Sequence, residues 1–376
     1  MSSRHTLVLI AVSALLATGC GSSAKRAVDR PRPVAQAPAA KPRPAPSGAL
    51  VGHYASPRVT GDYAGYPAVT AFIEEMAARH GFPKDYLAGV LSQAHRKQWT
   101  LDYLAKEAGP AVATPRPGAW TRYRSKFLTD LHINGGVNFW QRHGRSLQRA
   151  SERYGVPPEY ILGIMGVETL FGRNLGSHRV LDALTTLAFD YPRRGDYFRG
   201  ELEKFLVMAR NERIDPARPV GSYAGAMGLG QFMPSSFLSL AVDFDGDGHR
   251  DLWQADDAIG SIANYFAEHG WRRGEPVVTA ATATEANVQN LESGYDSDYA
   301  LATLMAKGIR PAAPVAEESS VSLLRLRADR GDEYWLGHKN FYVITRYNHS
   351  THYAMAVHQL AQAIKRRYLE SQRASR

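Results

Sequence analysis

Apolar residues recur three and four positions apart along most of the chain, a period that is typical of amphipathic α-helices. The pattern begins shortly after Tyr54 and continues close to the C-terminal end. It predicts helices over residues 67–80, 85–93, 126–154, 159–171, 182–189, 197–211, 234–240, 257–269 and 352–369. We therefore expect a folded body that is mostly helical.

One region follows a different pattern. Residues 321–327 alternate between apolar and polar, and residues 333–336 and 341–345 are rich in aromatic and β-branched side chains. These features are typical of short β-strands. No internal repeat is visible in the sequence. The sequence thus predicts an α+β protein, mostly α, with a small β-containing subdomain.

The net charge of +9 is unevenly distributed along the chain. Residues 1–50 hold seven Lys and Arg residues against a single acid, Asp29, so the rest of the chain is only weakly basic. Binding to nucleic-acid phosphates needs a concentrated basic patch. We therefore expect no nucleic-acid partner.

Residues 1–19 have the pattern of an export signal. A short positive end precedes an apolar run, residues 7–16, which is too short to span a bilayer stably. Small residues then lead to Cys20, the only cysteine, as in a bacterial lipobox, although Ala17 stands where leucine is usual. We expect Cys20 to be acylated and to anchor the protein to a membrane. An ordinary cleaved signal is the alternative.

Residues 20–50 are dominated by alanine, proline and basic residues, with six prolines between Pro31 and Pro46. Such a composition cannot form a core and predicts an extended tether, which leaves residues 51–376 as the folded body. Gly21 follows the cysteine, where an aspartate would resemble an inner-membrane retention signal. By that resemblance we expect a lipid anchor in the outer membrane, facing the periplasm.

The segment 159–171 carries one carboxylate, Glu168, among apolar residues and glycines. A glutamate in a helix is most often a solvated surface residue, and a buried glutamate bonded to a hydroxyl is a second structural interpretation. Burial in apolar surroundings raises a carboxyl pKa and keeps the group protonated near neutral pH. Such an acid can protonate a leaving glycosidic oxygen. Glu168 is therefore our candidate catalytic residue.

A second segment, residues 222–237, is a glycine-rich turn that runs into a predicted helix. Such a turn can close around an extended polymer. Together with Glu168 it suggests an enzyme that cuts glycan strands.

A third motif, Asp243-x-Asp245-x-Asp247-Gly248, matches the first half of an EF-hand calcium loop. Oxygen ligands stand at alternate positions, with glycine at the sharp turn. The usual glutamate at position twelve is replaced by Gln254, so a run of turn-forming aspartates without metal is the alternative.

Several motifs occur in a fixed order along the chain. They are Gly-Val-Glu168-Thr, the segment 222–237, Asp243-Phe-Asp-Gly-Asp-Gly-His249 with residues 257–266, and Arg346-Tyr-Asn348. Together they resemble the membrane-bound lytic murein transglycosylase B family, glycoside hydrolase family 103, over about residues 67–369.

The resemblance implies a lysozyme-like helical catalytic core and non-hydrolytic cleavage of peptidoglycan. The β-1,4 bond between N-acetylmuramic acid and N-acetylglucosamine would break, and the muramic 6-hydroxyl would close a 1,6-anhydro ring. Glu168 would act first as acid and then as base, without a catalytic cofactor. Ordinary glycosidases use two carboxylates. Asp182, Asp190 and Asp196 lie near Glu168 in the sequence, so the sequence alone does not exclude a second catalytic carboxylate.

The same resemblance assigns further roles. Ser222 would orient Glu168, and a set of groove residues would bind substrate: Tyr123, Arg193, Arg194, Tyr197, Gln231, Tyr265, Tyr347, Asn348 and Tyr353. Tyrosine rings offer apolar faces to sugars, and paired arginines suit carboxylates. The alternatives are half-buried core tyrosines and solvated arginines.

For the aspartate motif, the resemblance implies a longer loop that binds a structural Ca²⁺. The ligands would be Asp243, Asp245, Asp247, the His249 carbonyl and Asp257, with Asp256 as the rival donor.

Three functional hypotheses follow. The leading one is a lytic transglycosylase of cell-wall turnover, with peptidoglycan strands as substrate and other cell-wall enzymes as further candidate partners. The second is a hydrolytic muramidase, in which water completes the reaction. The third is a peptidoglycan-binding scaffold without turnover, which the presence of Glu168, Ser222 and Gln231 disfavours.

Overall fold

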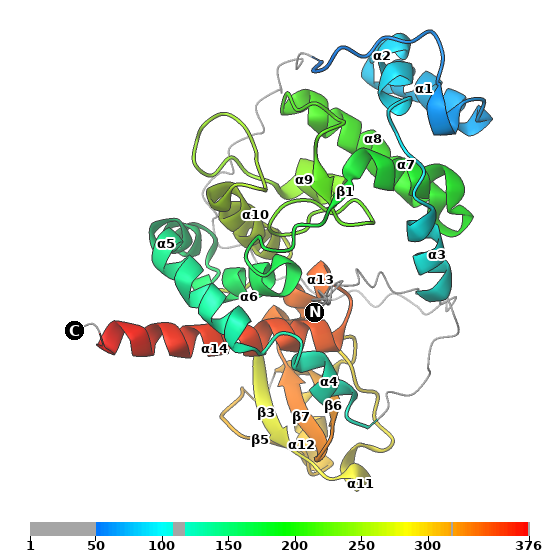
Figure 1. Cartoon of the computed structure of the whole chain (residues 1–376). Helices are drawn as coiled ribbons and strands as arrows, with labels where there is room; N and C mark the ends of the chain where they lie inside the picture. The colour runs from blue at the N-terminus through cyan, green and yellow to red at the C-terminus, as the bar shows by residue number, and fades with distance from the viewer. Residues whose placement is uncertain (1–49, 108–116, 317–318, 375–376) are drawn as a thin grey trace, which may run out of the picture.

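The computed structural model describes residues 50–107, 117–316 and 319–374, and within them helices predominate (Figure 1). The helices are α1 (Pro67–His80), α2 (Lys84–Leu91), α3 (Gln98–Glu107), α4 (Ala119–Arg124), α5 (Asp130–Tyr154), α6 (Pro158–Thr169), α7 (Val180–Asp190), α8 (Gly195–Asn211), α9 (Pro234–Leu240), α10 (Ala255–Glu268), α11 (Glu285–Val288), α12 (Leu301–Ala306), α13 (Lys339–Tyr347) and α14 (Thr351–Ala374).

The strands form two antiparallel sheets. They are β1 (His178–Arg179), β2 (Val220–Gly221), β3 (Val278–Thr282), β4 (Tyr299–Ala300), β5 (Arg310–Pro311), β6 (Ser320–Ala328) and β7 (Gly331–Gly337). β1 pairs only with β2, and the other five form a sheet of order β4-β6-β7-β3-β5. The hairpin of β6 and β7 is its longest pairing, with Leu324 opposite Trp335.

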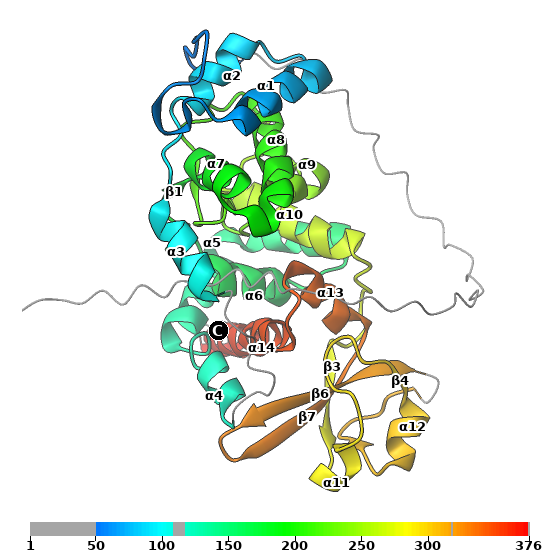
Figure 2. The ribbon, with the colours of Figure 1, turned by 90° about the vertical axis from the view of Figure 1, so that its right-hand side faces the viewer.

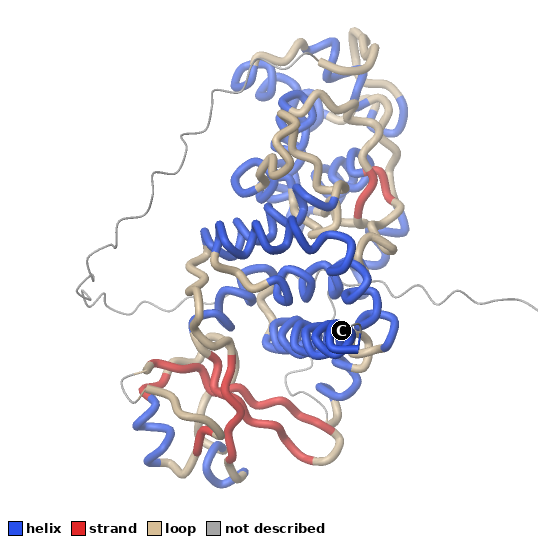
Figure 3. The backbone as a smooth tube through the Cα atoms, turned by 90° about the vertical axis from the view of Figure 1, so that its left-hand side faces the viewer, coloured by secondary structure: helices blue, strands red, loops and turns tan. Residues whose placement is uncertain are grey.

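The molecule is arranged in three tiers (Figures 1 and 2). α1, α2, α7, α8 and α9 form one end, α5, α6, α10 and α14 cross the middle, and the five-stranded sheet with α11 and α12 forms the other end. Figure 3 shows the two sheets well separated, with the helical middle tier between them. α6 packs against α5 and α14, and α13 joins the sheet to α14.

Burial explains why α6 forms the centre. All of its residues are buried except Pro158 and Glu168, which are partly exposed, because apolar side chains surround the helix instead of lining one stripe. Pro157 and Pro158 fix its first turn. One large hydrophobic cluster runs through the helical tiers, and a smaller one lies under the sheet around Leu304 and Leu323.

The predicted helices are confirmed, some with shifted ends; the helix expected over 126–154 begins at Asp130. The strands expected at 321–327 and 333–336 are confirmed as β6 and β7. The strand expected at 341–345 was wrong, because these residues belong to helix α13. Phe341, Ile344 and Thr345 are buried together while Tyr342 is exposed, a helical periodicity that five residues alone do not distinguish from a strand.

The predicted signal peptide, Cys20 and the tether up to residue 49 lie outside the described residues. Across the part of the chain that the structure describes, no helix combines the length and the apolar character needed to cross a bilayer.

Candidate active site

The end of α6 positions Glu168. The helix stops because Leu170 (φ 49°) and Phe171 (φ 57°) both adopt the left-handed conformation, a strained arrangement that is concentrated at functional sites. The Thr169 hydroxyl donates to the carbonyl of Leu229 at 2.9 Å. The last turn of α6 is thereby tied to the glycine-rich segment.

α14 approaches α6 closely enough to bring a second polar side chain to Glu168. A Cβ atom added at Gly163 would lie 2.9 Å from the carbonyl oxygen of Val357, so glycine is what permits this distance. The close approach brings Tyr353 of α14 to Glu168. Its hydroxyl donates to Oε1 of Glu168 at 2.5 Å.

Two opposing effects set the protonation of Glu168. Desolvation by the surrounding protein raises its pKa, and the hydrogen bond from Tyr353 lowers it by favouring the charged form. Desolvation dominates, and the pKa rises to about 7. Near neutral pH the group therefore exchanges readily between a proton donor and a proton acceptor.

Two further tyrosines among the predicted site residues, Tyr123 and Tyr347, lie near this carboxyl, and a third, Tyr265, packs against Tyr347. Its negative charge contributes to the raised pKa values of Tyr123 and Tyr347, after burial. The rings of Tyr265 and Tyr347 lie 4.6 Å apart. Their hydroxyls donate to the carbonyls of Arg346 and Gly230, at 2.6 and 2.7 Å. These bonds fix both rings in place.

The glycine-rich segment folds into tight turns beside α6. The Ser222 hydroxyl accepts the N–H groups of Ala224 and Ala226, at 3.3 and 3.0 Å. A hydroxyl that accepts two bonds still has its own proton to donate, so orientation of Glu168 by Ser222 stays a prediction. Gln231 has a positive φ of 52° and donates through Nε2 to the carbonyls of Leu175 and Gly228.

The other carboxylates considered from the sequence have different partners. Asp182 is 1% exposed and is bound by Lys97 and Arg179. Asp190 pairs with Arg96, and the exposed Asp196 pairs with Arg199. Each therefore has a cation as its partner, whereas no ion pair of Glu168 is found among the described residues, so Glu168 remains the candidate acid.

Comparisons with known proteins agree with this geometry. The family described as "Transglycosylase SLT domain" matches residues 65–362. Membrane-bound lytic murein transglycosylase B of Escherichia coli strain K12 is 50% identical over 308 residues, 81% of this chain and 84% of the relative. The chain belongs to the lytic murein transglycosylase B family.

Solved structures of this family support the fold. The E. coli lytic transglycosylase Slt35 in complex with calcium superposes with a TM-score of 0.78 at 50% identity, covering 83% of this chain and 97% of Slt35. Slt35 in complex with bulgecin A gives the same values. The expected mostly helical, lysozyme-like fold and the lytic transglycosylase function are thus confirmed.

The predicted arginines of the transglycosylase lie on the tier that contains α7 and α8. Arg193 and Arg194 form a 3₁₀ turn, Pro192–Arg194, just before α8. The guanidinium of Arg194 stacks 4.2 Å from the ring centre of Tyr197, which is 41% exposed. These three residues form an exposed cluster of their own, and their contact with substrate stays a prediction.

The aspartate loop gathers three of its five predicted ligands. Carboxylate oxygens of Asp243, Asp245 and Asp247 all lie within 4.8 Å of one another. Gly246 and Gly248 have φ values of 84° and 95°, which glycine adopts at little cost. The backbone thereby folds the three carboxylates toward one point, an arrangement that fits a hard cation.

Asp257 has a different environment from these three. Its oxygens accept the N–H groups of Phe244 and Asp251, at 2.6 and 2.7 Å, so it braces the loop from inside. Gln254 caps α10 by accepting the N–H of Asp256 and also donates to Asp245. The backbone N–H of His249 donates to Asp247. The roles of Asp257 and the His249 carbonyl as ligands stay predictions.

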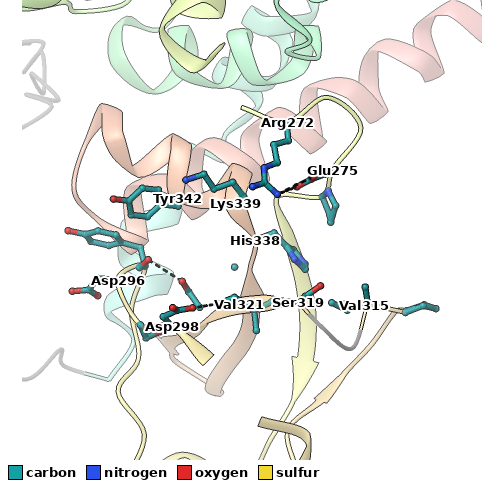
Figure 4. Close-up of a pocket in the computed structure, with 18 residues that line it drawn as sticks. Arg272, Glu275, Asp296, Asp298, Val315, Ser319, Val321, His338, Lys339 and Tyr342 are labelled. Carbon is teal, nitrogen blue, oxygen red and sulfur yellow. Dashed lines mark hydrogen bonds and ion pairs between the residues drawn. The ribbon is translucent and has the colours of Figure 1, made fainter. Parts of the chain in front are cut away.

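A cavity of about 920 Å³ lies apart from these residues, between the five-stranded sheet and the start of α13 (Figure 4). Charged side chains line it, with Arg272 and Lys339 on one side and Asp296 and Asp298 on another. None of the predicted site residues lines this cavity.

Sequence reasoning missed one relationship in the site. Tyr353 was predicted as a sugar contact, and the structure places its hydroxyl on Glu168. The two residues are 185 positions apart, so no local pattern connects them.

Proposed function

We propose that Glu168 is the single acid and base of this lytic transglycosylase. The observation that carries the proposal is a carboxyl with a pKa of about 7, desolvated at the end of α6 and held by Tyr353. A group with a pKa near the working pH serves both as acid and as base. A single residue with this property suffices for two proton transfers in succession.

In the first step, protonated Glu168 donates to the glycosidic oxygen as the bond from that oxygen to the muramic anomeric carbon breaks. Because Tyr353 occupies Oε1 and no hydrogen bond to the other oxygen is found among the described residues, that oxygen would carry the transferred proton. Positive charge develops at the anomeric carbon, and the substrate's own acetamido group assists, as the family resemblance implies. A second carboxylate is then unnecessary.

In the second step, ionised Glu168 takes the proton from the muramic 6-hydroxyl. The 6-oxygen attacks the anomeric carbon and closes the 1,6-anhydro ring, so no water enters the product. The hydrogen bond from Tyr353 stabilises the carboxylate that exists between the two steps. The acid is regenerated at the end of the cycle.

The surrounding residues would hold the sugar. The side-chain oxygen of Asn348 is buried and has no hydrogen-bond partner within the described ranges. Leaving such an acceptor unpaired is costly, and a substrate N–H or O–H would satisfy it once the side chains that cover it move aside. Tyr123, Tyr265 and Tyr347 would supply apolar faces, two of them on rings held by their hydroxyl bonds. The further proposed contacts are Ser222, Gln231, Arg193, Arg194 and Tyr197.

The test is mass spectrometry of the products that residues 51–376 release from isolated sacculi. We expect muropeptides one water lighter than hydrolytic products, and none with Glu168→Gln, which keeps the shape and loses the acid. Turnover by that variant would refute the role of Glu168. Water-added ends would indicate a muramidase, and binding without soluble product would indicate a scaffold.

We further propose that the aspartate loop binds a structural Ca²⁺. The three carboxylates fit the ion, and the related Slt35 has been solved in complex with calcium. Asp243, Asp245 and Asp247 would hold it, with His249 and Asp257 completing the set. The bound ion would neutralise like charges and brace the loop before α10.

For location, we propose a protein anchored by acylated Cys20 to the outer membrane, facing the periplasm. The name of the E. coli relative, a membrane-bound transglycosylase, supports an envelope location. The tether would let the folded body reach glycan strands away from the lipid surface.

A further inference from the structure

Trp99 exposes an unusually large apolar surface. It lies in the first turn of α3, and 47% of its surface is accessible to solvent. Exposing so much of an indole is costly, and exposed aromatic surface often marks a binding site.

Other aromatic side chains gather around this indole. The ring of Tyr103 stacks on Trp99 at 5.3 Å with an interplanar angle of 15°, and the ring of His178 stacks at 5.6 Å and 26°. The buried ring of Tyr223 meets Trp99 and Tyr103 edge-on, at 6.1 and 5.1 Å. The indole is thus supported by three neighbours while nearly half of its surface faces solvent.

The chain just before Trp99 is firmly anchored to α7. Asp182 accepts the backbone N–H of His95 at 2.9 Å and pairs with Lys97 at 2.8 Å. The backbone N–H of Lys97 also donates to the Thr186 hydroxyl. Burial alone raises the pKa of Asp182, but the bonds from Lys97, His95 and Arg179 outweigh it and keep the group ionised. The chain that leads into the aromatic cluster is therefore held against α7.

The cluster continues directly into the glycine-rich segment of the candidate active site. Tyr223 follows Ser222 in the chain, and His178 of β1 pairs with Gly221 of β2. Gln231 bonds to the carbonyl of Leu175, three residues before His178. Trp99 is therefore linked to the segment beside α6 through its contact with Tyr223 and through the β1–β2 pairing.

We propose that Trp99, supported by Tyr103 and His178, is a stacking platform for a pyranose ring of the glycan strand, at a subsite away from the scissile bond. The inference rests on the proposed function, since the occupant is a further sugar of the same polymer. The exposed apolar surface of the indole suits the apolar C–H face of a sugar and, as part of one rigid ring system, loses little entropy on binding. Such a subsite makes the enzyme favour long strands.

The experiment compares Trp99→Ala with wild type on peptide-free glycan strands, a short tetrasaccharide and a dodecasaccharide. We expect KM for the long strand to rise about two- to tenfold, the range of one aromatic stacking contact. The short strand and kcat should be unchanged. Trp99→Phe keeps a ring and should restore much of the loss, and Leu369→Ala, another exposed apolar side chain, is the matched control.

Binding gives a second readout in the inactive Glu168→Gln background. Adding the long strand should change tryptophan fluorescence, and most of that change should disappear when Trp99→Phe is added. Equal losses on both strand lengths, or no loss on either, would overturn the platform. If wild type itself yields no anhydro product, the proposed function fails instead, so the two failures are distinguishable.

Discussion

At the scale of single residues, Glu168 illustrates how stability is exchanged for chemistry. An ordinary glutamate would be solvated, and its carboxylate would be useless as an acid near neutral pH. Here desolvation raises the pKa to about 7, and one hydroxyl, that of Tyr353, limits the shift. Two predictions follow from these opposing effects.

The first concerns stability. The folded-state pKa of Glu168 lies above its unfolded value of 4.5, so folding is penalised as pH rises from about 4.5 through 7. Glu168→Gln removes the ionised form, and we expect it to be more stable than wild type at pH 8 by up to about 3 kcal/mol. Denaturant unfolding of both proteins at pH 4 and at pH 8 measures the difference in unfolding free energy. This difference should vanish near pH 4.

A matched control is Asp196→Asn, since that carboxylate is 94% exposed. A pH-independent effect of Glu168→Gln would contradict the raised pKa.

The second prediction concerns the rate profile. Tyr353→Phe removes the bond that favours the carboxylate, so the pKa of Glu168 should rise further. The alkaline limb of kcat/KM, where the acid form is lost, should move up by about one pH unit. Tyr347→Phe is the control, because its hydroxyl bonds to Gly230 instead. An alkaline limb that shifts equally in both variants would argue against the assignment.

At the scale of elements, two features decide the site: the close packing of α6 on α14, and the loop that precedes α10. The first depends on glycines within a helix, where glycine otherwise weakens the structure. The second depends on carboxylates brought together by turns. In both features the residues are unfavourable for local stability: glycine weakens a helix, and neighbouring carboxylates repel one another.

For the helix pair, Gly163→Ala forces a methyl group to 2.9 Å from the carbonyl oxygen of Val357. We expect a loss of about 1–3 kcal/mol in unfolding free energy, because the backbone of α14 must move. Gly200→Ala in α8, where only the tip of a lysine lies nearby at 3.5 Å, should be neutral or stabilising. Thermal unfolding of the two variants measures this difference in stability. Equal destabilisation by both substitutions would contradict the prediction.

For the aspartate loop, removal of the proposed calcium ion should lower the melting temperature, because an ion held by the folded loop would stabilise the folded state. At about 100 times its dissociation constant a ligand contributes roughly 2.7 kcal/mol. Asp243→Asn keeps the acceptor for Gly246 and weakens the metal site, so its melting should depend less on calcium. Identical melting of the wild type with calcium and after exhaustive chelation would refute the bound ion.

At the scale of the whole molecule, the chain order separates the site residues widely. α4, α6, the glycine-rich segment, α10 and α14 each contribute a predicted site residue, and the sheet lies between α10 and α14 in sequence. α14 packs on α4, α5, α6 and α13 and so closes the core around Glu168. The helical middle tier thus unites segments from almost the full length of the body.

The proposed anchor belongs to this scale. Cys20→Ser should prevent acylation and move the protein from the membrane fraction to the soluble fraction of bacterial cells. The activity of the folded body on sacculi should be unchanged, because the tether precedes the core. Fractionation together with fatty-acid labelling measures both effects. Retention of the variant in the membrane fraction would contradict anchoring through Cys20.

The sequence by itself determined nine of the helices, the apolar setting of Glu168 and the family, but not α3, α4, α11, α12 or α13. These depend on periodicity and contiguous motifs, which act over a few residues. It misassigned 341–345, because a short apolar run becomes a helix or a strand according to what it packs against. Only the tertiary structure placed Tyr353 on Glu168, paired Asp182 with Lys97 and stacked Trp99 on His178. Each of these contacts joins residues far apart in the chain, so the fold alone brings them within reach.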